Sequence, residues 1–336
     1  MKPRRIKYWG WGYEDEPDTP QFLIDNMETY FSKFFGVSEF NTIDLPALES
    51  IELRKPRIDI PQKFQDFCTN SHEERVRHAR GRSPIDYVKI FNGEYENPPD
   101  IVAYVRNEQD IIDVMDWAVG AKAAVIPFGG GTSVNGGIEP RVGDDYDAVI
   151  TIDTTLLNKV LEVDDVSRCA RIQAGALGPD LEAQLKSHGV SLRHFPQSFQ
   201  HSTLGGWIST RSGGHFATQY THIDEFVENL RLVTPTGTVA TRRMPGDGAG
   251  PDPDRLFMGA EGSLGIITEA WVQVQGRSKF RKSIAVFFDD FLTGAEAVRG
   301  IAQAGLYPSN VRIIDAEEAR VNFVSDKNKD ILFLAF

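Results

Sequence analysis

The chain has 336 residues, of which 41% are hydrophobic and 25% charged, a composition that predicts an ordinary globular protein of two or three domains. Its formal net charge of −12 argues against an extended nucleic-acid-binding surface. No apolar run reaches the length of a membrane span, and the basic N-terminus lacks the apolar core of a signal peptide. The two cysteines, Cys68 and Cys169, can form neither a disulfide framework nor a zinc site. We therefore expect a cytoplasmic protein with reduced, packed thiols and no metal.

The first 96 residues carry few strand signals. Apolar residues at helical spacing predict one helix over residues 20–35 and a second over residues 60–68. A polar stretch that contains four arginines follows: Arg75, Arg77, Arg80 and Arg82. We interpret this stretch as a solvated face, the alternative being that the arginines attract an anion near a cofactor.

Between residues 97 and 277 short apolar strands alternate with helical segments. A helix is predicted to begin at Glu108, with Asn107 as its N-cap, and another near Pro179, which suits a first helical turn. The pattern predicts an α+β domain with mixed sheets rather than a regular doubly wound repeat. Strands are predicted at residues 100–105, 123–128, 148–152, 159–163, 170–174, 227–233, 237–242 and 266–274.

A new unit is predicted to begin after Arg277. Its pattern favours a strand at residues 283–288, a helix at 294–305 and a strand at 311–314. The sequence then runs to six apolar residues, ILFLAF, at 331–336. Because a strand needs partners and a bounding turn, we expect the chain to be a fragment cut inside a larger domain.

The most informative segment is PFGGGTSV at residues 127–134, which follows a predicted strand. Three consecutive glycines permit a tight turn in which successive N–H groups converge on an anion such as a phosphate or pyrophosphate. The segment is not a Walker loop, because Gly137 and Ile138 stand where that motif needs Lys and Ser or Thr. It is not a Rossmann fingerprint either, because Val134 occupies the third glycine position. Taken alone, it could be an ordinary glycine-rich turn.

Two further clusters of small residues lie downstream, STLGGWISTRSGG at residues 202–214 and GAEGSLGIIT at residues 259–268. Their glycines would let a planar ligand approach the backbone, and their hydroxyl groups could hydrogen-bond its heteroatoms. Each cluster alone could be a turn or a bulge. Three such clusters on one α+β domain favour a nucleotide cofactor.

The order and spacing of the three clusters resemble the flavin-binding domain of the vanillyl-alcohol-oxidase (PCMH-type) flavoproteins, over residues 98–275. This resemblance implies that the first loop binds the pyrophosphate of FAD and that the other clusters line its isoalloxazine ring and the rest of the dinucleotide. Some relatives attach FAD covalently through a histidine in the first loop or a cysteine elsewhere. This chain has Thr132 and Ser133 in the loop, so we expect non-covalent FAD. The residues that the resemblance assigns to FAD are Pro127, Phe128, Gly129, Gly130, Gly131, Thr132, Ser133, Gln197, Ser198, Thr203, Gly206, Ser209, Thr210, Glu261, Gly262, Leu264, Gly265, Ile266 and Ile267.

Segments outside these clusters resemble the alkyldihydroxyacetonephosphate synthases and their bacterial relatives. They are KYWGWGY at residues 7–13, ERVRHARG at 74–81 and SNVRIID at 309–315. By this resemblance Arg312 would bind the substrate phosphate, which suits a guanidinium fork, and His194 would act in the active site. The alternatives are a surface arginine and a packed histidine.

Two departures from that family matter. Family members carry an acidic residue where this chain has Gln197. The tyrosine and histidine cluster that the family uses in catalysis lies in a part of the cap domain that this chain does not contain. The resemblance implies an α+β fold in three parts: an N-terminal helical extension (1–96), a two-part FAD-binding domain of PCMH type (97–277) and an incomplete α+β cap domain (278–336).

The function that the resemblance implies is an FAD-dependent transfer reaction of ether-lipid biosynthesis. The acyl group of acyl-dihydroxyacetonephosphate would be exchanged for a long-chain alcohol through an adduct at flavin N5. The alternative is an FAD-linked oxidoreductase (dehydrogenase) of a 2-hydroxy acid or an alcohol, which Gln197 favours. A third alternative is a flavin-binding protein without catalysis. The expected partner is a small-molecule or lipid substrate and not nucleic acid, while peripheral membrane contact and a homodimer stay open.

Overall fold

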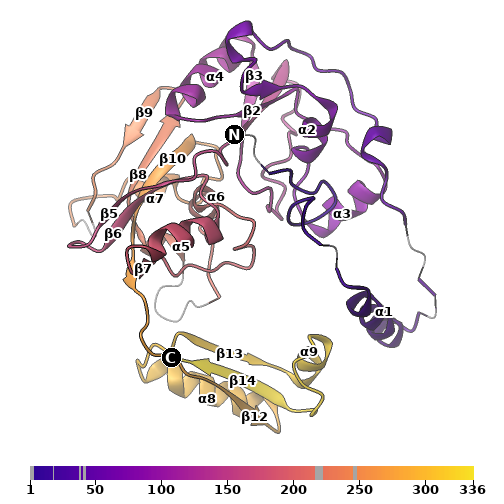
Figure 1. Ribbon diagram of the computed structural model, residues 1–336, viewed down its shortest axis with the longest axis vertical. Helices are drawn as coiled ribbons and strands as arrows, with labels where there is room; N and C mark the ends of the chain where they lie inside the picture. Colours follow the sequence, from indigo (N-terminus) through magenta and orange to yellow (C-terminus); the bar gives the residue numbers. More distant parts are fainter. Residues whose placement is uncertain (1–3, 18, 38, 41–42, 216–221, 245–247) are drawn as a thin grey trace. The chain divides into compact units, whose positions relative to one another are not determined.

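The computed structural model describes residues 4–17, 19–37, 39–40, 43–215, 222–244 and 248–336. Packing divides the chain into two compact units, which we treat separately. The first unit contains Met1–Glu16, Asp44–Ser212 and His222–Gly276, and the second contains Pro17–Ile43, Gly213–Thr221 and Arg277–Phe336. Figure 1 shows the elements of both units along the chain.

A four-stranded sheet forms one half of the first unit. In spatial order its strands are β1 (Cys68–Thr69), β2 (Ile101–Tyr104), β4 (Ala148–Asp153) and β3 (Ala123–Phe128). Strands β2, β4 and β3 are parallel, and β1 pairs with β2 in the antiparallel direction. Ile101, Ile150 and Ile152 from these strands are fully buried in the core. Because Phe128 pairs with Asp153, the segments that follow β3 and β4 start side by side.

A five-stranded antiparallel sheet forms the other half. Its strands are, in spatial order, β5 (Val160–Asp164), β6 (Cys169–Gln173), β10 (Ile266–Gln273), β8 (Val227–Thr234) and β9 (Gly237–Ala240). The predicted pairing around residues 234–237 is confirmed, since Thr234 pairs with Gly237. Val233 and Ile266 pack in the same core as Ile101, so one hydrophobic core joins the two sheets. A small two-stranded sheet pairs β7 (Val190–Ser191) with β11 (Gln275–Gly276).

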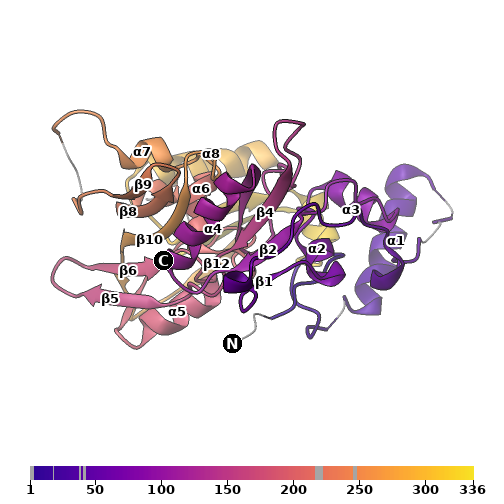
Figure 2. The same ribbon diagram turned by 90° about the horizontal axis from the view of Figure 1, so that it is seen from above.

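The helices of the first unit cover and connect these sheets. They are α2 (His72–Arg77), α3 (Pro84–Phe91), α4 (Glu108–Gly120), α5 (Gly178–Lys186), α6 (Leu204–Thr210) and α7 (Asp254–Phe257). Helix α4 begins as predicted, because the side chain of Asn107 accepts a hydrogen bond from the Asp110 N–H at 3.0 Å. It buries Ile111 and Val114, and it packs against β3 of one sheet and β8 of the other. Figure 2 views this helix from above.

The helix predicted over residues 60–68 is wrong. Gln62–Phe64 forms a single 3₁₀ turn after Pro61, and Cys68–Thr69 forms strand β1. Both Phe64 and Cys68 are buried in the core, and Cys68 pairs with Ala103 of β2. The apolar spacing that predicts a helix is therefore used by a turn and a strand, because pairing with β2 outweighs the local preference.

The prediction that the arginine stretch forms a solvated face is also wrong. All four arginines are at most 5% exposed: Arg75, Arg77, Arg80 and Arg82. Arg77 and Arg80 pair with carboxylates. Arg75 and Arg82 donate instead to backbone carbonyl oxygens. Burial of these guanidinium groups is tolerated because each one finds acceptors.

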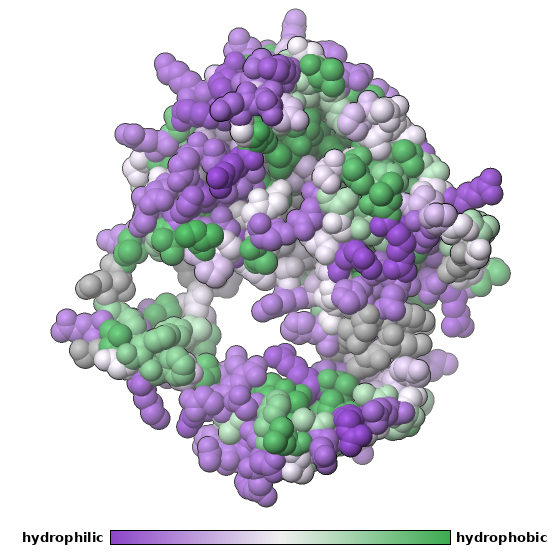
Figure 3. Space-filling model, turned by 180° about the vertical axis from the view of Figure 1, so that it is seen from behind, coloured by the Kyte–Doolittle hydropathy of each residue, from purple (hydrophilic) through white to green (hydrophobic). Residues whose placement is uncertain are grey.

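The second unit contains a three-stranded antiparallel sheet with β14 (Asp330–Ala335) between β12 (Ser283–Phe288) and β13 (Asn310–Ile314). Its helices are α1 (Gln21–Phe35), α8 (Phe291–Gln303) and α9 (Ala316–Val321). The α1 helix is confirmed, and hydrophobic surface gathers over it on the face shown in Figure 3, with Phe34 and Phe35 more than 60% exposed. Among the described residues, no helix has the length and apolarity to cross a membrane.

Candidate cofactor site

The glycine loop, residues 127–134, leaves the end of β3 at the edge of the four-stranded sheet. The Thr154 N–H and hydroxyl both donate to the Phe128 carbonyl oxygen, at 3.0 and 3.1 Å, and fix the point of departure. Gly131 has a φ of +69°, which a glycine adopts without steric cost. The backbone N–H groups of residues 130–134 have no acceptor among the described residues. The loop therefore presents consecutive free donors, an arrangement that binds anions.

Two glycines of the loop are required by the second cluster. A Cβ atom on Gly129 would overlap the Thr203 hydroxyl, and one on Gly130 would overlap the backbone oxygen of His201. The loop therefore lies directly against residues 201–203. Thr203 in turn caps helix α6, since its hydroxyl oxygen accepts a hydrogen bond from the Gly206 N–H at 3.3 Å.

Helix α6 is held on the five-stranded sheet by its first turn. The Leu204 N–H donates to Ala176 O at 3.0 Å, and the Gly205 N–H donates to Ala174 O at 2.7 Å. Gly205 and Trp207 are buried, whereas Gly206 between them is exposed. The helix thus presents a wall without a side chain at Gly206.

The third cluster, residues 259–268, closes the arrangement. Its Gly259 and Glu261 N–H groups donate to Ile208 O and Ser209 O of α6, at 3.1 and 3.0 Å. Its Gly262 lies so close to the Pro127 ring that a Cβ atom there would overlap it. The three clusters, far apart in sequence, therefore meet beside the C-terminal ends of β3 and β6 and the N-terminal end of β10.

The meeting point is a cavity of about 320 Å³. Most residues that the sequence assigns to FAD line it: Pro127, Phe128, Gly129, Gly130, Gly131, Thr132, Ser133, Ser198, Thr203, Gly206, Ser209, Thr210, Glu261, Gly262, Gly265, Ile266 and Ile267. Gln197 and Leu264 are not among its lining residues. The volume lies within the usual range for small-molecule sites.

The cavity also has lining residues that the sequence reasoning did not assign to FAD. Thr154 and Ala174 come from the ends of β4 and β6, and Asn135 follows the glycine loop. Asn135 donates to a Glu261 carboxylate oxygen at 2.7 Å and thereby ties the first cluster to the third. Nothing in the sequence near Thr154 or Ala174 separates them from ordinary strand residues. Their signal is spatial, because strand pairing brings them to the loop.

His194 is packed beneath α6 and does not line the cavity. It is 3% exposed, its ring lies 5.3 Å from the Trp207 ring, and its Nε2 is 2.9 Å from the Ser212 hydroxyl, which does line the cavity. Burial lowers the pKa of His194 to about 4, and the charge of His222 acts in the same direction. His194 is thus a neutral imidazole near pH 7 that could act on a ligand only through Ser212 or after a shift in structure.

Arg312 belongs to the second unit, on β13. Its side chain is 53% exposed, and its guanidinium lies 3.3 Å from a Glu318 carboxylate oxygen. The role predicted for it stays a prediction.

The comparisons with known proteins agree with the cavity. A family model described as an FAD binding domain matches residues 99–242. Residues 99–242 are thus similar to this FAD-binding family. The cofactor of the chain is FAD, and the FAD-binding domain contains the first two clusters of the cavity.

Relatives of two kinds were found for this flavoprotein. It is 32% identical over 358 residues to alkyldihydroxyacetonephosphate synthase of Trypanosoma brucei brucei, which covers 98% of this chain and 58% of the relative. A solved alkyldihydroxyacetonephosphate synthase superimposes with a TM-score of 0.86 at 28% identity, over 98% of this chain and 69% of the other. Glycolate oxidase subunit GlcD of Bacillus subtilis is 29% identical over 76% of this chain and 51% of its own. The chain spans 56–58% of the length of these curated synthases.

The residues of the cavity fit FAD. The free N–H groups of residues 130–134 suit the pyrophosphate, which is anionic. The bare wall at Gly206 and the apolar faces of Pro127 and Ile266 suit a flat ring. The Glu261 carboxylate also lies at the cavity, but it accepts a hydrogen bond from the Asn135 side-chain amide. This hydrogen bond links the first cluster to the third.

Proposed function

We propose that the flavoprotein is an FAD-dependent enzyme with the chemistry of the alkyldihydroxyacetonephosphate synthases. One observation carries the proposal: similarity to a synthase extends over 98% of the chain, well beyond the FAD-binding domain, whereas similarity to the oxidoreductase relatives covers 76–89%. The substrate would then be a phosphorylated lipid, acyl-dihydroxyacetonephosphate, and the second substrate a long-chain alcohol. The reaction belongs to ether-lipid biosynthesis, in the cytoplasm.

The protein's own residues would bind and orient. FAD supplies, when bound, the electrophilic ring at which the substrate carbon reacts. The N–H groups of residues 130–134 would hold its pyrophosphate, and the Gly206 wall would leave room for the ring. Arg312 would hold the substrate phosphate after exchanging its exposed Glu318 partner for a doubly charged anion. His194 is neutral near pH 7 and could accept or donate one hydrogen bond through Ser212.

The second candidate is an FAD-linked oxidoreductase of a 2-hydroxy acid. Gln197, which replaces the acidic residue of the synthases, supports it, and so does the likeness to a glycolate oxidase subunit. In that reaction a hydride would leave the substrate carbon, and an external acceptor would reoxidise the cofactor.

An anaerobic titration separates the two candidates. The flavin-loaded protein is mixed with palmitoyl-dihydroxyacetonephosphate, and separately with D-lactate or glycolate, while the visible flavin band and released fatty acid are followed. Bleaching by the acyl phosphate with stoichiometric fatty acid and no electron acceptor consumed is the expected result. Bleaching by a hydroxy acid, with recovery of the band on admission of oxygen, would replace the synthase proposal by the oxidoreductase. Arg312→Ala is expected to weaken the response to the phosphorylated substrate, whereas Arg299→Ala, which removes an exposed arginine of α8, is expected to leave it unchanged.

A further inference from the structure

A turn near the N-terminus packs against the outer side of the glycine loop. We call residues 4–16 the N-terminal turn. Ile6 and Tyr13 form an antiparallel bridge, and the Lys7 N–H donates to Gly12 O at 2.9 Å, which closes the turn. The space between this turn and the glycine loop has a volume of only about 10 Å³. A gap of that size holds about one water molecule, so the turn and the loop are in close packing.

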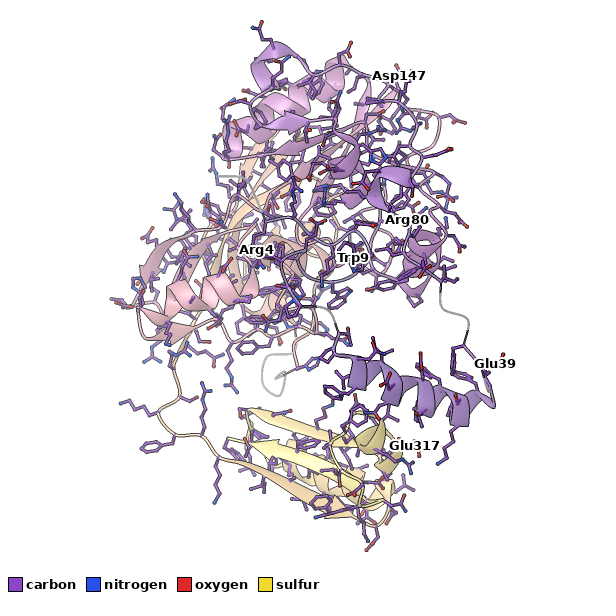
Figure 4. The ribbon with its side chains drawn as sticks, turned by 45° about the vertical axis from the view of Figure 1, so that its right-hand side comes forward. Arg4, Trp9, Glu39, Arg80, Asp147 and Glu317 are labelled. Carbon is purple, nitrogen blue, oxygen red and sulfur yellow. The ribbon has the colours of Figure 1, made fainter. Side chains whose placement is uncertain are left out.

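Arg82 joins the two segments. Its guanidinium donates to Lys7 O at 2.6 Å and to Gly10 O at 2.7 Å in the turn. The backbone N–H of the same residue donates to Ser133 O of the glycine loop at 2.7 Å. Arg82 lies just after α2 and before α3, and Figure 4 labels Arg80 on this segment and Trp9 on the turn. One buried residue thus bonds the turn on one side and the cofactor loop on the other.

All three nitrogen atoms of the Arg82 guanidinium donate hydrogen bonds. Two further hydrogen bonds run from Arg82 to Gly81 O at 2.8 Å and Arg80 O at 3.1 Å. Among the described residues no carboxylate accepts from it. Its acceptors are all backbone oxygens, so these hydrogen bonds link backbone segments to one another. A lysine would keep the charge but could not span the same carbonyls, because its donors radiate from one atom.

Close packing leaves the loop little freedom at this point. Gly81 has no room for a Cβ atom, which would overlap Ser133 O, and Gly130 is blocked by His201 O. The His201 ring also meets the Tyr13 ring of the turn, at 5.9 Å between centroids. The glycine loop is therefore enclosed by the Arg82 segment, the turn and residue 201, and its open side faces the cavity.

We propose that Arg82 is a positioning residue for FAD, which pins the N-terminal turn against the glycine loop and thereby fixes the loop's N–H groups in the array that grips the pyrophosphate. Neither the turn nor Arg82 lies in the matched FAD binding domain, residues 99–242. Residues that precede the domain in sequence thus complete its cofactor site. The inference rests on FAD binding in the cavity and not on which substrate the enzyme uses.

The test compares FAD affinity with stability in two matched arginine pairs. Arg82→Lys and Arg82→Gln are expected to weaken FAD binding to the apoprotein on the order of tenfold or more, with Lys giving little rescue. Arg75→Lys and Arg75→Gln are the controls, because Arg75 is similarly buried and also donates to backbone oxygens (Pro99 O and Arg54 O, each at 2.7 Å), but neither oxygen belongs to the N-terminal turn or the glycine loop. They are expected to lower the melting temperature and to leave the FAD dissociation constant unchanged. The readouts are flavin fluorescence titration and melting with and without FAD.

A second pair of variants keeps the test decisive if the Arg82 variants do not fold. Gly12 has a φ of +92°, at which an alanine is strained, and a Cβ atom there would push against the Glu16 carboxylate, whereas Gly10 has nothing within 4 Å of that position. Gly12→Ala is therefore expected to distort the turn and weaken FAD binding, and Gly10→Ala is expected to do neither. Wild-type FAD affinity in folded Arg82→Lys and Arg82→Gln, or in Gly12→Ala, would overturn the proposal. Wild-type protein that binds no FAD would contradict the cofactor site itself, which is a different failure.

Discussion

Gly206 offers a test of where the flavin lies, because the effects on the empty protein and on the cofactor complex should have opposite signs. Gly206 is exposed in the first turn of α6, on the cavity wall. An alanine Cβ there would meet only the Thr203 hydroxyl oxygen, at 3.3 Å, which needs a shift of a few tenths of an ångström. Alanine is favoured over glycine in a helix by up to about 1 kcal/mol. The free energy of unfolding of apo Gly206→Ala should therefore stay equal or rise.

FAD affinity should fall in the same variant. The new methyl group would project into the space that the ring would occupy. A loss of about 1.4 kcal/mol of binding free energy corresponds to a dissociation constant that is tenfold larger. Gly206→Leu should cost more. Gly205→Ala is the matched control: its Cβ would lie 2.8 Å from the Ala174 Cβ, inside the protein, so apo stability should fall by about 1–3 kcal/mol.

The assays are urea unfolding of the apoprotein and titration with FAD by flavin fluorescence. If Gly206→Ala and Gly206→Leu both bind FAD with wild-type affinity and spectrum, the flavin does not lie along α6 and the assignment of this wall is wrong. Loss of apo stability in Gly206→Ala would instead refute the packing argument.

Further predictions concern charge and pH. Hydrogen bonds from Arg54 and Arg57 and from two backbone N–H groups lower the pKa of the buried Asp100 to about 2. The stabilising contribution of the Asp100 carboxylate is therefore present above pH 4 and is lost as the pH falls toward 2. Asp100→Asn should lower the free energy of unfolding, measured in urea at pH 7, by about 3 kcal/mol and should flatten that acid dependence. Burial lowers the pKa of His194 from 6.5 to about 4, so between these pH values the unfolded chain binds a proton that the folded chain does not bind. The free energy of unfolding should therefore fall by about 3 kcal/mol as the pH drops from 6.5 to 4. His194→Gln should remove this pH dependence, and an unchanged pH dependence would contradict the burial argument. Asn135→Asp places a second carboxylate beside Glu261 at the cavity, so FAD affinity should fall and should recover partly at high salt. In the control Asn135→Ala, the salt dependence of FAD affinity should equal that of the wild type.

Local signals in the sequence predicted the parts of the fold that local physics decides. Asn107 caps α4 because a short polar side chain before an apolar periodic run satisfies a free N–H group, wherever the helix later packs. The three glycine clusters are equally visible, since only glycine tolerates the close approaches found at Gly129, Gly130 and Gly262. Their convergence in one cavity also follows from sequence, but only through resemblance to a flavoprotein family, because no spacing in the chain states which loops meet.

The misassigned arginines show why the rest could not be predicted. Arg75, Arg77, Arg80 and Arg82 stand in a polar stretch, and polar stretches are normally solvated because burial of an unpaired charge is costly. Acceptors from distant parts of the chain offset that cost. Arg77 donates to a Glu14 carboxylate oxygen at 2.6 Å, 63 residues away in sequence, and Arg82 donates to Lys7 O, 75 residues away. The decisive partners are thus set by the return of the N-terminal turn to the glycine loop. A residue pattern read locally contains the donors and not the acceptors, so it cannot tell a solvated arginine from one that holds two distant segments together.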